Sequence, residues 1–539
     1  MFYINFFCTL LILILILNVK SKEKINLSNN IYWIIFCAFF ILGFCLRVYK
    51  FSQIPAGINQ DEAMAAVEAK SLLEYGTDRF GMRYPVYFTG WIYSQMNVLM
   101  SYIMILPIKL FGFNIFAVRL PNLFFSIIGM IFLFMLSKDM FGKIPALIIF
   151  NFCTINPWHI MQSRWALEAN LLPHIFIIAI YFFYRGLKNS KKIFIYLSMF
   201  FFAMCMYCYG ISFYTVNLFL LICAIYIYTK KILSLKEIIY CFLIYLLFSW
   251  PIYAVMFINI FDIDTIRTPW FTIPYFPYQC RQKDILFFCD NPILQLKMNF
   301  VSLLKFLFQI CLSTSSNIND FGAIYICSVP LLFLGIIYAC KNFRTEFFIV
   351  LTNFFIGIFA ALITSDIDLC LNRANFIFYS MIILIGIGIN NLINKKNFYV
   401  LFVIYYMMTA TFCSIYFNEY KNYIAEVFYY DFVEVLEYTK KNNYEQIFIT
   451  SNTQYRNSAD VSEIITLFCH NIDSKYFRGQ KKINSKIYAE KYFYKDFLRN
   501  HAIPKKNTVY IIRDFELRKQ YLKKFKVKKF GRFYLMKSK

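Results

Sequence analysis

Residues 31–46 read IYWIIFCAFFILGFCL, a run without a single charged side chain. A helix needs about 20 apolar residues to cross the hydrocarbon core of a bilayer, and this run comes close to that length. Hydrophobic residues make up 60% of the 539-residue chain and charged residues only 16%, whereas soluble domains carry about a quarter charged residues. The composition excludes a soluble globular protein and predicts an all-α polytopic membrane protein.

Apolar runs of similar length recur along the chain. Residues 92–111 are also apolar, but counting them as a span would put the basic loops that follow on the outer side, so we expect a re-entrant or interfacial helix in an outer loop there. We treat residues 298–312 in the same way. The remaining runs predict twelve spans, at 3–18, 31–47, 119–137, 144–157, 169–184, 193–209, 211–229, 238–258, 323–340, 347–364, 376–393 and 398–417.

The loops between these spans differ sharply in charge. The first span is followed by Lys20, Lys22 and Lys24 and preceded by no basic residue, which is the wrong flank for a signal peptide and predicts a retained helix. Successive loops lie on alternating sides of the membrane. The loops on the same side as Lys20 carry 16 Lys and Arg against four Asp and Glu, while the rest of residues 1–417 carries 14 Lys and Arg against 13 Asp and Glu. Short basic loops stay cytoplasmic, so this bias predicts the orientation.

The chain therefore divides into three predicted parts. Residues 1–30 form an extra N-terminal transmembrane helix and a cytoplasmic linker. Residues 31–417 form the membrane module, with outer loops at about 48–118, 158–168 and 259–322. Residues 418–539 are expected to form a small extracytoplasmic α/β domain.

Local patterns in this last part support the α/β assignment. VFYYDFVEVLEYTKKN predicts an amphipathic helix, QIFIT and TVYIIR predict strands, and KVKKFGRFYLM predicts a terminal strand or hairpin. The domain supplies +12 of the chain's net charge of +25. That charge favours membrane lipid or an anionic cell-surface polymer as partner, and no nucleic acid is expected outside the cell.

The 16 cysteines give little evidence of a metal or redox site. Cys205 and Cys208 lie inside an apolar run, so the sequence predicts two small buried side chains there. Cys280 and Cys289 could pair in an outer loop, but their spacing does not demand it.

The acidic residues are the more informative ones, because 13 of the 17 before residue 418 fall in outer segments, Asp366 and Asp368 among them. In the first outer loop, Asn59 and Glu62 have the spacing of a capping box and Gly76 can end the helix. Asp61 would then lie in the first helical turn. Considered alone, Asp61 and Glu62 are adequately explained as residues that complement the helix dipole.

The second outer loop, NPWHIMQSRWALEAN, adds His159, Arg164 and Glu168 just before a span. Each has an ordinary explanation on its own, as an interfacial histidine or a solvated helix end. Two acid-bearing outer loops with cations beside each acid fit a site that activates a hydroxyl next to a bound phosphate.

Four segments together make the chain resemble the GT-C membrane glycosyltransferases, especially the protein mannosyltransferase-like branch that includes the lipid A aminoarabinose transferase. They are NQDEA at 59–63, GTDRFGMRYPVYF at 76–88, FAVRLPNLFFSIIG at 116–129 and NPWHIMQSRWALEANLLP at 156–173. The resemblance covers about residues 31–180. It implies a GT-C-like helical module that transfers a sugar from a polyprenyl-phosphate donor to a hydroxyl acceptor on the outer face, whether protein, lipid or envelope glycan.

The resemblance also implies roles for particular residues. Asp61 matches the general base of the first loop, with Glu62 beside it, and Glu168 stands where the family more often has Asp. The WWD-type signature of oligosaccharyltransferases is absent. The candidate groups for substrate binding are His159 and four arginines, Arg79, Arg83, Arg164 and Arg373.

Three alternatives stay open on the residues. Arg373 lies at the outer mouth of a span, where snorkelling to lipid headgroups explains it equally well. A divalent metal could be shared by Asp61 and Glu168, although no ligand spacing predicts one. The rival function is a multi-span transporter or flippase, which would carry ionisable residues near the middle of the membrane and paired broken helices.

Overall fold

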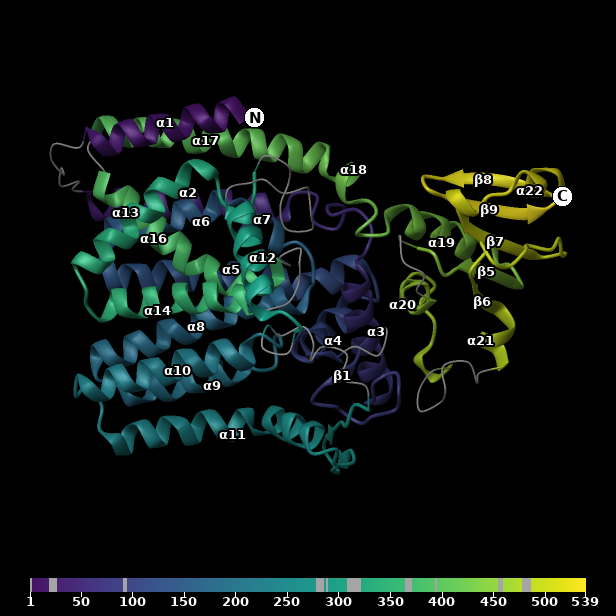
Figure 1. Cartoon of the computed structure of the whole chain (residues 1–539), viewed down its shortest axis with the longest axis horizontal. Helices are drawn as coiled ribbons and strands as arrows, with labels where there is room; N and C mark the ends of the chain where they lie inside the picture. The colour runs from purple at the N-terminus through teal and green to yellow at the C-terminus, as the bar shows by residue number, and fades with distance from the viewer. Residues whose placement is uncertain are drawn as a thin grey trace. The chain divides into compact units, whose positions relative to one another are not determined.

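The computed structural model describes residues 2–18, 27–90, 95–277, 286, 289–307, 321–363, 371–392, 395–453, 459–476 and 486–539. Asp366, Asp368 and Cys280 therefore lie outside the described residues. The chain divides into two compact units (Figure 1). The first comprises Met1–Phe51, Asn122–Tyr253 and Arg281–Tyr420, and the second Ser52–Pro121, Ala254–Cys280 and Lys421–Lys539.

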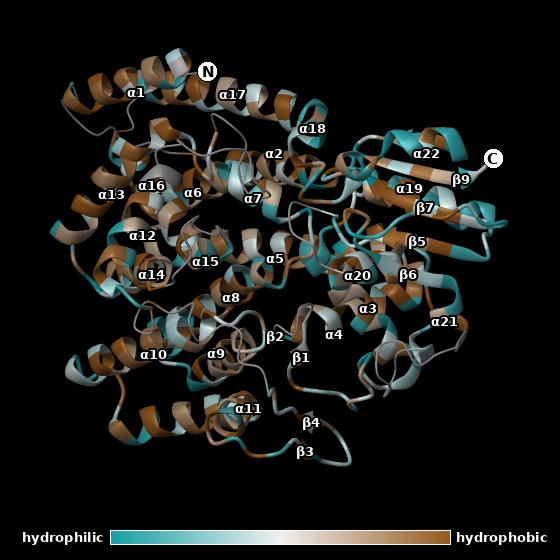
Figure 2. Ribbon diagram, turned by 45° about the vertical axis from the view of Figure 1, so that its right-hand side comes forward, coloured by the Kyte–Doolittle hydropathy of each residue, from teal (hydrophilic) through white to brown (hydrophobic). Residues whose placement is uncertain are grey.

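The first unit is helical, and hydrophobic residues dominate its helices (Figure 2). Three helices, α5 (Ile115–Phe141), α11 (Leu235–Ile260) and α18 (Tyr420–Ile424), continue from one unit into the other. The others of this unit are α1 (Phe2–Leu17), α2 (Asn29–Val48), α6 (Lys143–Ile155), α7 (Pro157–Gln162), α8 (Glu168–Asn189), α9 (Lys192–Cys205), α10 (Ser212–Thr229), α12 (Pro292–Leu307), α13 (Val329–Lys341), α14 (Thr345–Leu362), α15 (Leu371–Ala374), α16 (Phe378–Leu392) and α17 (Lys395–Asn418).

Small residues let two of these helices approach closely. A side chain at Gly335 of α13 would collide with the backbone of Leu384 in α16, and one at Gly388 would collide with that of Leu331. Glycine is typical of helix contacts inside membranes. Helices surrounded by lipid gain nothing from the hydrophobic effect when they associate, so their association depends on close van der Waals packing. α16 is accordingly buried along almost its whole length.

Eight helices in the described part of the chain are long and apolar enough to cross a membrane. They coincide with eight of the twelve predicted spans. The other four predicted spans are apolar helices of 10–17 residues, and so is α4 (Leu99–Phe111), which lies in the segment predicted to be interfacial. The protein is a multi-pass membrane protein, and the number twelve stays a prediction. Cys205 and Cys208 are buried and free, as expected.

The second unit contains α3 (Gln60–Tyr75), α4 and a mixed five-stranded sheet near the C-terminus. The strand order is β6-β5-β7-β9-β8, with β5 parallel to both neighbours and β9 antiparallel to both of its own. The strands are β5 (Gln446–Thr450), β6 (Tyr492–Lys495), β7 (Thr508–Arg513), β8 (Phe525–Phe530) and β9 (Phe533–Ser538), and the helices around them are α18 (Tyr420–Ile424), α19 (Tyr430–Asn442), α20 (Ala459–Cys469), α21 (Lys486–Lys491) and α22 (Lys519–Lys524).

The predicted helix, both predicted strands and the terminal hairpin are confirmed as α19, β5, β7 and the β8–β9 pair. One face of the sheet buries an aromatic core around Phe448, Tyr510 and Phe525. Two two-stranded ribbons complete the unit, β1 (Phe88–Thr89) with β2 (Gln95–Met96) and β3 (Ile266–Arg267) with β4 (Thr272–Ile273).

Candidate active site

The segment that carries Asp61 begins α3 in the second unit. The Asn59 side chain accepts a hydrogen bond from the backbone N–H of Asp61 at 3.0 Å, and the Glu62 carboxylate accepts one from the Asn59 N–H at 3.2 Å. Gly76 ends the helix in the left-handed conformation. Both predicted ends of the helix are confirmed, and Asp61 lies in its first turn.

Glu62 is fixed by an arginine that the sequence analysis did not single out. Arg119 of α5 donates from Nε and Nη2 to the two oxygens of Glu62, each at 3.0 Å. It also donates to the carbonyls of Pro55 and Gly57, at 2.8 and 2.9 Å. Neither side chain of the ion pair has any exposed surface. Arg119 thus anchors both the loop before α3 and the first turn of that helix.

Asp61 differs from its neighbour because its side chain is only half-buried. Burial, and after it the negative charge of Asp61, raises the pKa of the Tyr429 hydroxyl, so this phenol lies close to the carboxylate. The two segments are also joined by their backbones, since the Ile58 N–H donates to Phe428 O at 2.8 Å. Of the two acids of this turn, Asp61 is therefore the one with exposed surface.

Arg79 lies in a second buried ion pair of the same unit. Its Nε is 2.9 Å from Glu68 Oε1, and its backbone N–H donates to the other oxygen of Glu68. Burial raises the pKa of Glu68 and of the adjacent Asp78 above their ordinary values. The positive charge of Arg79 opposes the rise at Glu68, and backbone hydrogen bonds from Met82 and Phe80 oppose it at Asp78. Arg83, six residues beyond Thr77 in the same loop, is exposed instead.

In the first unit, Arg164 follows α7 and donates hydrogen bonds to free carbonyls at the C-terminal end of α2. Its guanidinium donates to the carbonyls of Arg47 at 2.7 Å and Tyr49 at 2.6 Å, and it lies over the rings of Tyr416 and Phe417. The last carbonyls of a helix have no partner within the helix. Arg164 is fully buried and supplies donors to that end of α2.

His159 belongs to a buried chain of hydrogen bonds in the same unit. Arg47 donates to its Nδ1, with Nη2 at 2.9 Å. Because a guanidinium can only donate, Nδ1 is the acceptor and the ring proton is on Nε2, which contacts the Tyr379 hydroxyl at 2.9 Å. The same hydroxyl contacts His174 Nδ1 at 2.8 Å. Both ring nitrogens of His159 are therefore engaged within the protein.

Glu168 opens α8 and is largely buried. Asn375, which follows α15, donates to the carbonyl of Ala169 at 3.1 Å and to the side chain of Asn170 at 3.0 Å. These bonds attach the turn that carries the half-buried Arg373 to the beginning of α8. Glu168 and Arg373 are thus brought to one corner of the first unit.

The predicted site residues divide between the two units. Asp61, Glu62, Arg79 and Arg83 belong to the second, whereas the remaining four, His159, Arg164, Glu168 and Arg373, belong to the first. Within the described ranges, no cluster of three or more His, Cys, Asp or Glu side chains is arranged to hold a metal ion.

Sequence reasoning missed Arg47, Arg119, Tyr379 and Tyr429. The two arginines had a usable signal, because a charge in or at the end of an apolar run is costly and calls for a partner. The two tyrosines are among 42 in the chain, and nothing in their local sequence marks them.

Comparison with known proteins gives a consistent fold. Residues 97–260 match the family described as dolichyl-phosphate-mannose-protein mannosyltransferase. No curated protein matches the chain. The crystal structure of ArnT from Cupriavidus metallidurans in the apo state aligns with a TM-score of 0.53 at 11% identity, over 94% of this chain and 98% of ArnT.

Two further structures align as well. ArnT from the same organism bound to undecaprenyl phosphate has a TM-score of 0.56 at 10% identity, over 95% of this chain and 98% of that one. The oligosaccharyltransferase of Archaeoglobus fulgidus has a TM-score of 0.49 at 12% identity, over 80% of this chain and 61% of that one. At these identities the ArnT alignments establish the fold. The chain has the GT-C fold and resembles the protein mannosyltransferase and ArnT branch of the membrane glycosyltransferases.

Proposed function

We propose that this protein is a glycosyltransferase that moves a sugar from a polyprenyl-phosphate donor to a hydroxyl acceptor on the outer face of the membrane. The observation that carries the proposal is the first turn of α3, which is held in place by hydrogen bonds and an ion pair. There Arg119 and Asn59 fix Glu62, and Asp61 beside it keeps a partly exposed carboxylate. A carboxylate on a rigid, pre-positioned turn suits general base catalysis.

Asp61 would act on the acceptor hydroxyl. The hydroxyl oxygen attacks the anomeric carbon of the sugar, and the bond between that carbon and the phosphate oxygen breaks. The electron pair of the broken bond leaves with the phosphate, and the hydroxyl proton goes to Asp61. The products are the glycoside and the polyprenyl phosphate, so no nucleotide is consumed.

The leaving phosphate needs cations, and the four arginines are not equivalent in this respect. Arg79 and Arg164 have their guanidinium groups in a buried ion pair and on helix-end carbonyls, so we assign them to positioning, and His159 with them. Arg83 is exposed and Arg373 only half-buried, and we assign phosphate binding to these two. Glu168, at the same corner as Arg373, is the proposed second acid.

The first test replaces the base itself. Asp61→Asn keeps the shape of the side chain but removes its basicity, so transfer from a polyprenyl-phosphate sugar by the purified protein in liposomes should fall at least ~10²-fold. The matched control is Asp460→Asn, because Asp460 is also a half-buried aspartate in the first turn of a helix of the same unit.

Equal activity of the Asp61 and Asp460 variants would reduce Asp61 to a helix-start residue. If the wild-type protein moved the lipid carrier across the bilayer without transferring sugar, the transporter function would replace the proposed one.

Donor binding tests Arg373. Loss of a hydrogen bond to a charged group costs about 1.5–3 kcal/mol, so Arg373→Ala should raise the donor concentration for half-maximal transfer roughly tenfold or more. The acceptor dependence should stay unchanged. Arg185→Ala, which removes an arginine paired with Asp139, is the control. An unchanged donor dependence would leave Arg373 as a headgroup anchor.

Labelling in intact cells tests the proposed outer position of the C-terminal domain. In a protein without native cysteines, a cysteine at the exposed position Lys506 should react with an impermeant thiol reagent, and one at the exposed position Asn189 should not. Labelling only at residue 189 would reverse the orientation and move Asp61 to the cytoplasmic side.

A further inference from the structure

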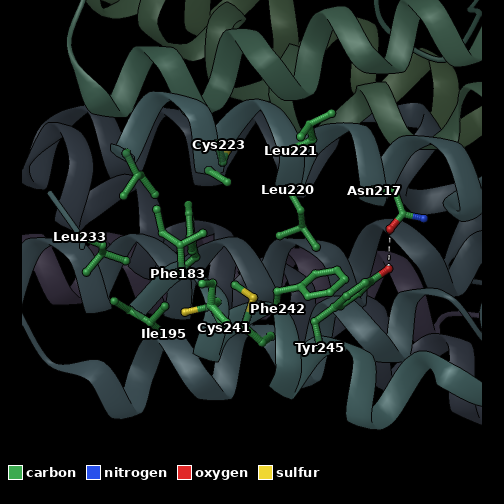
Figure 3. Close-up of a pocket in the computed structure, with 15 residues that line it drawn as sticks. Phe183, Ile195, Asn217, Leu220, Leu221, Cys223, Leu233, Cys241, Phe242 and Tyr245 are labelled. Carbon is green, nitrogen blue, oxygen red and sulfur yellow. Dashed lines mark hydrogen bonds between the residues drawn. The ribbon is translucent and has the colours of Figure 1, made fainter. Parts of the chain in front are cut away.

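An apolar cavity of about 360 Å³ lies between helices α9, α10 and α11 of the first unit (Figure 3). In Figure 1 the ribbon of α11 runs apart from those of α9 and α10, and side chains such as Phe200 of α9 and Phe248 of α11 make contact between them. Leu220 and Cys223 of α10 face Cys241 and Phe242 of α11 across the hollow. The cavity plays no part in the proposed sugar transfer, and the inference drawn from it does not rest on that function.

This cavity is suited neither to holding ordered water nor to remaining empty. A buried water molecule needs two to four polar partners. Among the described residues that line the cavity, only Asn217 and Tyr245 have side chains with polar oxygen or nitrogen. Those two are already bonded to each other at 2.9 Å, and Tyr253 donates to the same Asn217 oxygen at 2.6 Å. An empty cavity would leave its lining without dispersion contacts on one side. A hydrocarbon chain satisfies both conditions.

The cavity is open to the bilayer. Leu221, Ile239 and Phe242 line it and are also largely exposed, at 58%, 48% and 57%. In a membrane this exposed surface contacts lipid, so an acyl chain can enter sideways without crossing a polar barrier.

The depth of the cavity matches one leaflet. At one end it reaches Leu233, just beyond the end of α10 at Thr229, and at the other it reaches Asn217. Twelve residues of helix separate Asn217 from Thr229, which is about 18 Å at 1.5 Å per residue. Half of a ~30 Å hydrocarbon core is about 15 Å. The occupant therefore has a headgroup at the level of the α10–α11 loop.

That loop is basic. Lys230, Lys231 and Lys236 flank Leu233, and all three are exposed. Lys192 of α9 already has a partner in Glu237 at 2.8 Å, whereas no carboxylate of the described residues pairs with the other three. Phosphate groups of anionic lipids attract lysines at this level of the membrane.

We propose that α9, α10 and α11 bind one anionic phospholipid, with an acyl chain in this cavity and the headgroup phosphate against Lys230, Lys231 and Lys236. The basic loop alone would be explained by its role in membrane topology. The cavity that opens directly beside Leu233 adds a place for the chain of the same lipid.

Native mass spectrometry of the full-length protein in detergent tests the proposal with three probes: phosphatidylglycerol, phosphatidylcholine and undecaprenyl phosphate. The wild type should retain one phosphatidylglycerol in preference to phosphatidylcholine. The triple variant Lys230→Gln, Lys231→Gln, Lys236→Gln should bind phosphatidylglycerol at least about tenfold more weakly. Ala224→Phe, which fills the cavity from α10, should lose that lipid.

Lys143→Gln, Lys188→Gln, Lys341→Gln is the matched control, because it removes the same charge from other basic loops and should bind normally. The triple lysine variants alter only surface groups, so they decide the question even if Ala224→Phe does not fold. Equal binding of both phospholipids, equal weakening by the control, or displacement of phosphatidylglycerol by undecaprenyl phosphate would overturn the proposal. The last result would assign the cavity to a polyprenyl chain.

Discussion

Arg119 in the second unit and Arg47 in the first are both completely buried, yet their charges are satisfied in different ways. Arg119 meets the carboxylate of Glu62 with two parallel hydrogen bonds. Arg47 has no carboxylate partner among the described residues. It donates instead to the carbonyls of Cys153 and Thr154 at the end of α6, each at 3.1 Å, and to His159.

The difference shows what a membrane helix end can offer to a cation. The last carbonyls of a helix carry the negative end of its dipole, and they have no partner within the helix. A guanidinium placed there finds several acceptors without bringing a second charge into the protein. The carboxylate of Glu62 does bring a second buried charge, and it also fixes the turn beside Asp61.

The comparison predicts its largest effect at Arg119. Arg119→Met leaves the Glu62 charge buried without its partner, and loss of one member of a buried ion pair typically costs about 3–5 kcal/mol. The free energy of unfolding in mixed micelles should fall by about that amount. Sugar transfer should fall as well, because the loop at Pro55 and Gly57 loses its anchor.

The double variant Glu62→Leu, Arg119→Met tests whether the loss comes from the unpaired Glu62 charge. Replacing a whole buried ion pair by apolar side chains often changes the free energy of unfolding very little. The double variant should recover most of the lost stability but not the transfer activity. If the double variant were no more stable than Arg119→Met, the cost would lie in the lost loop carbonyl contacts and not in an unpaired charge.

Much of the local structure could be predicted from the sequence because its signals are local. Asn59, Glu62 and Gly76 predicted both ends of α3 within a single helix, and the strands β5 and β7 were predicted from short apolar runs. The apolar runs likewise predicted the helices of the membrane module.

The contacts of the candidate site could not be predicted in this way. Arg119 and Glu62 are 57 residues apart, Arg47 and His159 are 112 apart, and His159 and Tyr379 are 220 apart. Only the packing of helices brings these groups together. For that reason the sequence could suggest substrate binding for Arg164 and His159, but it could not predict that Arg164 donates to helix-end carbonyls or that His159 lies in a buried hydrogen-bond chain.

A smaller effect is expected at Arg47. Arg47→Met removes the charge itself and leaves only neutral acceptors, the carbonyls of Gly43, Cys153 and Thr154 and Nδ1 of His159. A buried polar group left without its hydrogen bond costs about 1–3 kcal/mol, so the loss of unfolding free energy, measured as for Arg119→Met, should stay below the loss at Arg119. Arg47→Lys should recover only part of it, because an ammonium is a point charge without the planar fork of donors. A loss at Arg47 equal to that at Arg119 would mean that helix-end carbonyls bind this cation as strongly as a carboxylate does. The distinction between the two arginines would then rest on their positions and not on the charge of their partners.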